Sequence, residues 1–372
     1  MTSPVYQWQP TSRAVADRFG LPVAAVVRFD HNTSPFGTGW AAVEATRLAA
    51  RLNEYPAADY APLRAAAAAY AGTSPDRVAV GAGADELIGL AAAAFLRPGG
   101  TAVAAPPTYA LYAVATARRH AALHTVDRRG PDFALPVREV ATAAANADLV
   151  WLCVPHNPTG DRPDDDAVAS IITAAGGVVV LDAAYAEFAG DSWTDWIDRH
   201  PDLIVLHTLS KAFGLAGIRT GYALGSPERI AALDRVRPPG SISTISAGLA
   251  RIALEDPGRA QATVAAIGAE RDRLAGRLDA LGLRVLPSMT NFLLCEVGAG
   301  AARLAADLMA EGLVVRTFRP GGPLDGYLRF TVRSPEDDDR LLAVGQPVDM
   351  IAIAHQALAD AATQFFIVFY EQ

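Results

Sequence analysis

The chain has 372 residues, of which 51% are hydrophobic and 19% are charged, and this length is enough for one large or two medium domains with buried cores. Its formal net charge of −8 offers no basic surface for nucleic acid, and no window holds the roughly eighteen unbroken apolar residues that a membrane span needs. There is no apolar signal core at the N-terminus, and two cysteines are too few for a disulfide framework. A soluble cytoplasmic protein without a metal site is expected.

The first part of the chain predicts an arm, a short strand and two helices. Residues 1–22 are polar and mixed, and residues 23–29 favour a strand that leads into a turn containing Asn32. Helices are expected over residues 40–52 and 62–70, with Tyr55 in the loop between them.

From residue 78 onward, apolar runs typical of buried strands alternate with helical stretches. The expected strands cover residues 78–80, 102–105, 149–154, 178–181 and 203–206. Polar or aromatic residues follow several of them, namely Tyr109, Asn157 and Asp182. Ligands in open α/β sheets bind at the carboxyl ends of the strands, so this pattern predicts a ligand site.

A glycine turn after the first of these strands suits a phosphate. Gly81-Ala82-Gly83-Ala84-Asp85 leads from the strand into a helix, whose first backbone N–H groups have no partner within the helix. Such a short motif is common in tight turns, and Asp85 has a plainer interpretation as a helix cap.

The one lysine of the chain, Lys211, is the strongest candidate for a catalytic residue, since the rest of the Lys and Arg total is arginine. An amine can lose its proton and attack a carbonyl carbon, whereas a guanidinium stays protonated in proteins. A Schiff base with an aldehyde cofactor fits this chemistry. The nearby Ser210 hydroxyl and Arg219 guanidinium suit a phosphate on that cofactor.

The segment Ser-Lys-Ala-Phe-Gly-Leu-Ala-Gly-Ile-Arg-Thr-Gly-Tyr, residues 210–222, resembles the cofactor-lysine segment of fold-type I pyridoxal-phosphate (PLP) aminotransferases. It is most similar to the histidinol-phosphate aminotransferase branch. Pro-His-Asn-Pro-Thr-Gly at residues 155–160 and Asp-Ala-Ala-Tyr-Ala-Glu-Phe at residues 182–188 also match the family. The resemblance covers roughly residues 5–340.

The resemblance implies an α/β fold-type I architecture, in which a large domain with a mainly parallel seven-stranded sheet between helices is joined to a smaller α+β C-terminal domain. The expected domains are residues 1–38, an N-terminal arm and part of the small domain; 39–240, the large PLP-binding domain; 241–345, the small domain; and 346–372, an apolar tail of unclear role. The small domain is expected to contain strands at 283–286, 292–297, 314–317 and 327–332 and helices at 245–254, 258–281 and 301–311.

The resemblance also implies roles for individual residues. Lys211, Asp182 and Tyr185 are the implied catalytic residues. Those that bind the cofactor, pyridoxal 5'-phosphate, are Gly83, Ala84, Asp85, Tyr109, Asn157, Asp182, Tyr185, Ser210, Lys211, Arg219 and, from the second subunit of a homodimer, Tyr55. Asn32, Arg316 and Arg329 would bind the substrate. Taken singly, Tyr55 and Tyr109 also fit packing tyrosines, and the two arginines fit surface residues.

Four positions depart from the family pattern. Thr33 and Ser34 replace an acid and an asparagine, Ala183 replaces a glutamate, and Arg333 stands where glycine is common. The leading hypothesis is amino transfer between an anionic amine or amino acid, such as histidinol phosphate, and 2-oxoglutarate, in amino-acid biosynthesis or in secondary metabolism.

Three alternatives stay open beside this hypothesis. A decarboxylase of the threonine-phosphate type would use the same cofactor residues. A PLP-binding regulatory module without turnover is disfavoured, because the stretch before Asn32 is too short for a DNA-binding domain. The plainest alternative is an α/β protein that binds no cofactor.

Overall fold

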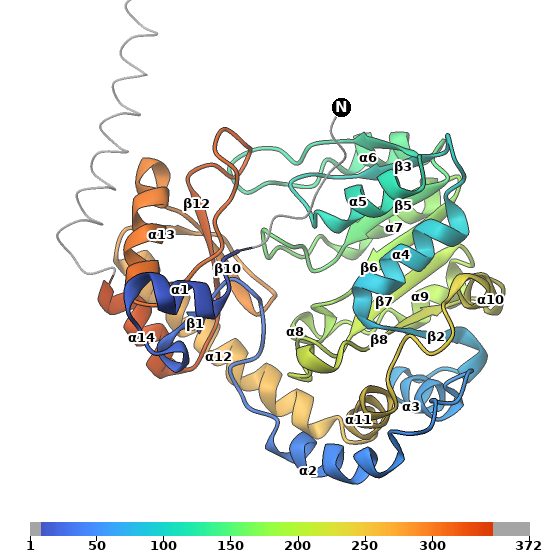
Figure 1. The fold of residues 1–372 in the computed structure, drawn as a ribbon. Helices are drawn as coiled ribbons and strands as arrows, with labels where there is room; N and C mark the ends of the chain where they lie inside the picture. Colours follow the sequence, from blue (N-terminus) through green and yellow to red (C-terminus); the bar gives the residue numbers. More distant parts are fainter. Residues whose placement is uncertain (1–8, 345–372) are drawn as a thin grey trace, which may run out of the picture. The chain divides into compact units, whose positions relative to one another are not determined.

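The computed structural model describes residues 9–344, which divide into two compact units (Figure 1). The large unit contains residues 36–265, and the small unit contains residues 9–35 and 266–344. The predicted boundary after residue 240 lies earlier than the observed division, because helix α11 (Thr244–Glu255) packs against α2 (Gly39–Leu48) and α3 (Ala61–Ala71) of the large unit. The expected tail at 346–372 lies outside the described residues.

A seven-stranded sheet forms the centre of the large unit, with the strand order β2-β8-β7-β6-β5-β3-β4. Only β8 runs antiparallel to its neighbours, β2 and β7, so the prediction of a mainly parallel seven-stranded sheet is confirmed. The strands are β2 (Val78–Gly81), β3 (Thr101–Ala104), β4 (Ala122–Thr125), β5 (Leu149–Cys153), β6 (Val178–Asp182), β7 (Leu203–Thr208) and β8 (Gly221–Gly225).

Helices bury their apolar sides against this sheet. One core joins α4, α5 and α10 to the sheet through side chains such as Leu87, Tyr112 and Leu233, which meet Trp151 and Leu206 of the strands. Figure 1 shows α4, in cyan, beside the green strands. Besides α2, α3 and α11, the helices of this unit are α4 (Gly83–Phe95), α5 (Leu111–Arg118), α6 (Val137–Ala144), α7 (Asp165–Ala174), α8 (Ala186–Ala189), α9 (Thr194–Arg199) and α10 (Pro227–Val236).

The small unit contains two short sheets. Strands β12 (Tyr327–Thr331), β10 (Phe292–Glu296) and β9 (Arg284–Val285) pair in antiparallel fashion, and β1 (Val27–Arg28) pairs in parallel with β11 (Leu313–Val314). Three predicted strands, 23–29, 283–286 and 314–317, are observed as pairs of residues and are therefore shorter than expected. The helices are α1 (Ser12–Phe19), α12 (Gly258–Ala280), which begins in the large unit, α13 (Ala301–Ala310) and α14 (Pro335–Val344).

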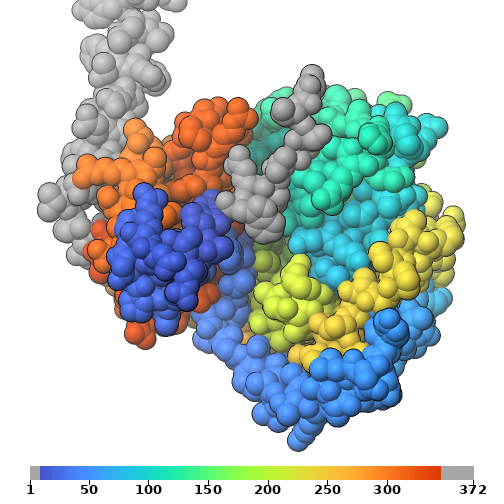
Figure 2. Space-filling model, in the orientation of Figure 1, coloured from blue at the N-terminus to red at the C-terminus, as the bar shows by residue number. Residues whose placement is uncertain are grey.

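The N-terminal segment is folded into the small unit. Residues expected to form an arm contain helix α1, whose first turn is capped by the Thr11 hydroxyl and whose end is closed by Gly20 at φ +68°. Helix α1 contacts α13, and Figure 2 shows the blue N-terminal residues against the orange residues of this unit. Within residues 9–344, no helix is both long enough and apolar enough to cross a membrane.

The large unit also holds a partly buried carboxyl group near two tyrosines. Burial raises the pKa of Glu187, on α8, to about 7. A charge at Glu187 in turn raises the pKa values of Tyr70 and Tyr222, in both cases after the larger effect of burial. The folded protein therefore holds the Glu187 proton at pH values where the unfolded chain has lost it.

This proton predicts a pH-dependent stability. Between the ordinary carboxyl pKa and about 7, the folded state binds more protons than the unfolded state, so the free energy of unfolding should fall as the pH rises through this window. Glu187→Gln should flatten the dependence and make the protein more stable than wild type by about 1 kcal/mol at pH 8. Urea unfolding at a series of pH values measures the free energy of unfolding and its dependence on pH. The exposed Glu228→Gln is the control, and a slope unchanged by Glu187→Gln contradicts the prediction.

Candidate active site

The predicted residues of the large unit lie at the carboxyl ends of adjacent strands. Asp182 is the last residue of β6, Asn157 follows β5, and Lys211 follows β7. These strands are parallel neighbours in the sheet, so their ends reach one edge. The Lys211 amine lies 5.8 Å from the centre of the Tyr185 ring, and its charge acts on the pKa of Asp182.

The segment that carries Lys211 is a closed loop between β7 and β8. The Leu209 backbone N–H donates to the carbonyl of Thr220 across its base, and the Leu215 N–H donates to the carbonyl of Leu209. A tight turn at Lys211 itself is closed by the Gly214 N–H, which donates to the Lys211 carbonyl at 3.1 Å. These backbone bonds set the path of the chain around the amine.

Next to this loop, the start of α4 forms a cradle with Arg219 and Ser210. The Arg219 guanidinium donates to the Ser210 hydroxyl at 3.3 Å through Nη1 and to the Asp85 carboxylate at 3.0 Å through Nη2. Gly83 has φ +81°, and a Cβ added there would lie 2.7 Å from Nη2 of Arg219. Guanidinium, hydroxyl and helix N–H groups together are the donors that bind phosphate in proteins.

Asp85 bridges two other predicted residues. Its carboxylate accepts from the Tyr109 hydroxyl at 2.9 Å and from Arg219. The interpretation of Asp85 as a side-chain cap of α4 is not what the structure shows, since that helix begins without a side-chain capping bond. Asp85 instead orients an aromatic ring and a guanidinium toward the same site.

Asp182 is only 5% exposed, and both of its oxygens have donors. Oδ1 accepts from the Ala184 backbone N–H at 3.1 Å, and Oδ2 accepts from the Tyr112 hydroxyl at 2.7 Å. Burial raises the pKa of Asp182, while the Tyr112 and Ala184 hydrogen bonds lower it. Tyr112 was not among the residues predicted from the sequence, although it lies three residues after Tyr109.

A buried polar network holds the turn that carries Asn157. The Thr159 hydroxyl contacts His156 and donates to Asp161, and Asp161 is paired with the buried Arg128. Burial lowers the pKa of His156, as does the Arg128 charge, so the imidazole is neutral. The sequence motif indicated the turn but not the arginine that anchors it from another segment.

The three predicted substrate residues lie together in the small unit. Arg316 and Arg329 face each other through two backbone hydrogen bonds of 3.1 Å. The buried Arg329 guanidinium donates to the carbonyl of Asp30 at 2.9 Å and lies 5.0 Å from the centre of the Phe292 ring. Asn32, at φ 52°, is buried and bonded to the hydroxyl of Thr331.

Arg333, which stands where glycine is common in the family pattern, has a structural explanation. Its Nη1 donates to the carbonyls of Thr33 and Ser34 at 3.3 and 3.5 Å and to the Thr33 hydroxyl at 3.4 Å. Three of the four departures from the family pattern are therefore in contact within the small unit.

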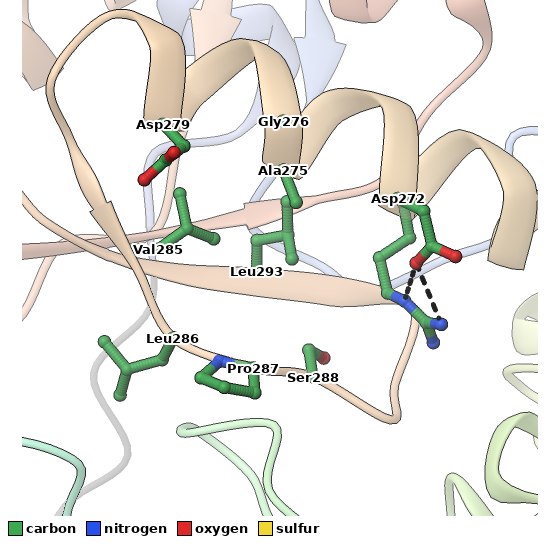
Figure 3. Close-up of a pocket in the computed structure, with 10 residues that line it drawn as sticks. Asp272, Ala275, Gly276, Asp279, Val285, Leu286, Pro287, Ser288 and Leu293 are labelled. Carbon is green, nitrogen blue, oxygen red and sulfur yellow. Dashed lines mark hydrogen bonds and ion pairs between the residues drawn. The ribbon is translucent and has the colours of Figure 1, made fainter.

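Two features lie apart from these clusters. The Tyr55 side chain, in the loop before α3, is 96% exposed. A hollow of about 340 Å³ in the small unit, between α12 and the segment that begins with β9, contains none of the predicted site residues (Figure 3). Its lining is mixed, with Val285, Leu286 and Leu293 beside the ion pair of Arg271 and Asp272.

The geometry can be compared with known proteins. The model of the family described as aminotransferase class I and II matches residues 24–344. The chain belongs to this family. It is a PLP-dependent transaminase, as the amine, carboxylate and anion cradle of the large unit also indicate. The predicted fold type is confirmed by the same findings.

Several relatives of this chain are histidinol-phosphate aminotransferases. This chain is 40% identical to the histidinol-phosphate aminotransferase of Roseiflexus castenholzii, over 89% of its own length and 91% of the relative. It is 35% identical to that of Methanothermobacter thermautotrophicus, again over 89% and 91%. The crystal structure of histidinol-phosphate aminotransferase from Sinorhizobium meliloti in complex with pyridoxal-5'-phosphate is 27% identical, with a TM-score of 0.84 over 94% of this chain and 96% of that one.

The cradle formed by Gly83, Ser210 and Arg219 predicts that one added methyl group weakens cofactor binding. Gly83→Ala should push Arg219 away from Ser210 and weaken the binding of pyridoxal phosphate by about tenfold, the loss of one charge-assisted hydrogen bond. Titration of the apoprotein with the cofactor, followed by absorbance, measures the affinity.

Gly72→Ala is the matched control for this change. Gly72 has a similar φ of +72°, but nothing lies within 4 Å of an added Cβ. Both variants should lose about 1 kcal/mol of stability to backbone strain, and only Gly83→Ala should lose affinity. Equal affinities in the two variants would contradict the cradle.

Proposed function

We propose that this aminotransferase moves an amino group between histidinol phosphate, or a similar anionic amine, and 2-oxoglutarate, as a cytoplasmic homodimer. The observation that carries the proposal is the meeting of one lysine, one buried carboxylate and one anion cradle at the ends of adjacent strands. The choice of substrate is supported by the names of relatives that are 35% and 40% identical.

The residues of the large unit fit the cofactor. Bound pyridoxal phosphate supplies an aldehyde that joins amines and a protonated ring that withdraws electrons from the substrate carbon. Its phosphate would be bound by Ser210, Arg219 and the N–H groups of Gly83 and Ala84. Asp182 would face the ring nitrogen as a carboxylate and hold it protonated.

The remaining residues would orient the ring and move a proton. Tyr109, tied to Asp85, would cover the ring, while Asn157 and Tyr185 would donate to its oxygen. Lys211 would link to the aldehyde at rest and, once an incoming amine has displaced it, take the proton from the α carbon. The turn bonds around Lys211 and the 5.8 Å approach to the Tyr185 ring support this role.

Arg329 and Arg316 would recognise the anionic group of the substrate, together with the segment at Asn32. The buried Arg329 guanidinium is held by the Asp30 carbonyl and lies over the Phe292 ring, so little side-chain entropy remains to be lost on binding an anion. The proposal of a homodimer is supported by large side chains that are exposed on the large unit. Tyr55 is 96% exposed, and the apolar Val43 and Leu52 of the same region are 57% and 61% exposed, which suits a subunit contact.

The solitary lysine allows a direct test. Lys211→Ala should lower turnover by at least about a thousandfold, because the general base is lost. Lys211→Arg keeps the positive charge but cannot link to an aldehyde, so it should be equally inactive. Borohydride reduction of the wild type should attach the cofactor to the peptide that contains residue 211, identified by mass spectrometry. A cofactor label on any other peptide contradicts the proposal.

The substrate is tested with matched amines. Histidinol phosphate should be preferred over histidinol by roughly 10- to 100-fold in kcat/KM, the value of charge-assisted bonds to one anionic group, with 2-oxoglutarate as acceptor. Arg329→Gln should remove most of this preference, whereas the exposed Arg303→Gln should keep it.

The same assay separates the second candidate function. The contact of Arg333 with Thr33 and Ser34, all outside the family pattern, favours keeping a phosphoamino-acid decarboxylase in the test. Release of carbon dioxide from threonine phosphate without a keto acceptor, with no keto product from histidinol phosphate, would establish the decarboxylase and refute the transaminase substrate.

A further inference from the structure

A buried phenol binds the carboxylate that is proposed to face the cofactor. Tyr112 is 1% exposed, and its hydroxyl donates to Oδ2 of Asp182 at 2.7 Å. The second oxygen of Asp182 accepts from the Ala184 backbone N–H at 3.1 Å. Hydrogen bonds to the charged form of a buried carboxyl stabilise that form.

Toward the Asp182 carboxylate, the Tyr112 hydroxyl acts as a hydrogen-bond donor. Burial raises the pKa of Tyr112 well above its ordinary value, and the Asp182 charge raises it further. The hydroxyl therefore keeps its proton at neutral pH. Its proton is directed at Asp182, where it opposes the effect of burial on the carboxyl.

Other titratable groups around Asp182 come from three elements. Asp85 of α4 raises the pKa of Asp182, and Lys211 lowers it. Cys153 of β5 is the register partner of Asp182, and burial raises the pKa of its thiol, so the thiol is neutral. The hydrogen bond from Tyr112 has a larger effect on the pKa of Asp182 than any of these groups, and only the effect of burial is larger.

A clamp on α5 and β5 fixes the phenol. The Tyr112 ring stacks on Trp151 with centres 5.3 Å apart and planes at 7°, and the Trp151 Nε1 donates to the Thr116 hydroxyl at 3.1 Å. Tyr112 and Thr116 are four residues apart and so share one face of α5. The Tyr109 ring also packs on the Tyr112 ring in a T-shaped contact, with ring centres 5.7 Å apart. The phenol is therefore held in place over the carboxylate.

We propose that Tyr112, clamped by Trp151 and Thr116, is a positioning residue that keeps Asp182 charged and aimed at the ring nitrogen of the bound cofactor. This rests on the role of Asp182 in the proposed function. Tyr112 touches neither substrate nor cofactor in this account and acts through the Asp182 carboxylate.

Tyr112→Phe removes the donor and keeps the ring. Cofactor affinity of the apoprotein should fall about tenfold at neutral pH, since a hydrogen bond to a charged group is lost. A carboxyl without this donor takes up a proton at higher pH, so the acid limb of the affinity profile should move upward by about one pH unit. Absorbance titration with pyridoxal phosphate from pH 5 to 9 gives both values.

Two controls separate this role from a structural one. Tyr222→Phe removes another buried phenol of the large unit, on β8 and 2% exposed, and should leave the acid limb in place. In an Asp182→Asn background, Tyr112→Phe should cause no further loss of affinity, because no carboxylate remains to be charged.

The outcomes distinguish the two proposals. If Asp182→Asn binds the cofactor as wild type does, the proposed role of Asp182 fails. If Asp182→Asn weakens binding while Tyr112→Phe behaves like Tyr222→Phe, or if the two losses simply add, the positioning role is overturned.

Thr116→Val replaces Tyr112→Phe if the latter does not fold. Thr116→Val removes the hydrogen bond that holds Trp151 and leaves the Tyr112 phenol in place. It should therefore shift the acid limb of the affinity profile upward by a smaller amount. A wild-type profile in Thr116→Val contradicts the clamp.

Discussion

Burial of the Asp182 carboxylate at the end of β6 is the constraint on which the rest of the large unit depends. A charged carboxyl away from water is costly unless its oxygens receive hydrogen bonds, and here both do, from Tyr112 and from Ala184. The backbone donor follows from the turn after β6. The phenol donor requires α5 to lie against β5, where Trp151 holds it. The packing of this core and the charge of the site are therefore one arrangement.

In the anion cradle, too, a charged side chain is held by hydrogen-bond partners from neighbouring segments. The Arg219 guanidinium is paired with Asp85 and reaches the Ser210 hydroxyl, so its geometry is set by neighbours from α4 and from the lysine loop. Gly83 leaves the space that the guanidinium occupies. Asp85 also binds the Tyr109 hydroxyl, which links the phosphate end of the site to an aromatic ring. One carboxylate thus orders two of the predicted cofactor contacts.

The small unit gathers the residues that set this chain apart from its family pattern. Arg333 lies about three hundred positions after Thr33 and Ser34 in the sequence, but it contacts both in the structure. Their contact ties the segment after Asn32 to the residues that follow β12, the strand that carries Arg329.

The sequence by itself determined five of the seven strands of the large sheet, the lysine and the turns that follow the strands, but not β4 or β8. Those features are local, because apolar runs, glycine turns and the only lysine are visible within short windows. It also placed Tyr109, Asn157 and Asp182 after strand ends, and the parallel sheet brings such ends to one edge.

The tertiary structure decided what depends on contacts between distant segments. Tyr112 carries no motif that names Asp182 as its partner, Arg128 lies well before the turn that it anchors, and Arg333 meets Thr33 only when β12 packs beside the N-terminal segment. Helix α11 belongs to the large unit because of its packing on α2 and α3, which the Pro-Pro-Gly break at residues 238–240 does not reveal. Hydrogen bonds and packing between remote segments leave no periodic pattern in the sequence, so only the folded chain specifies them.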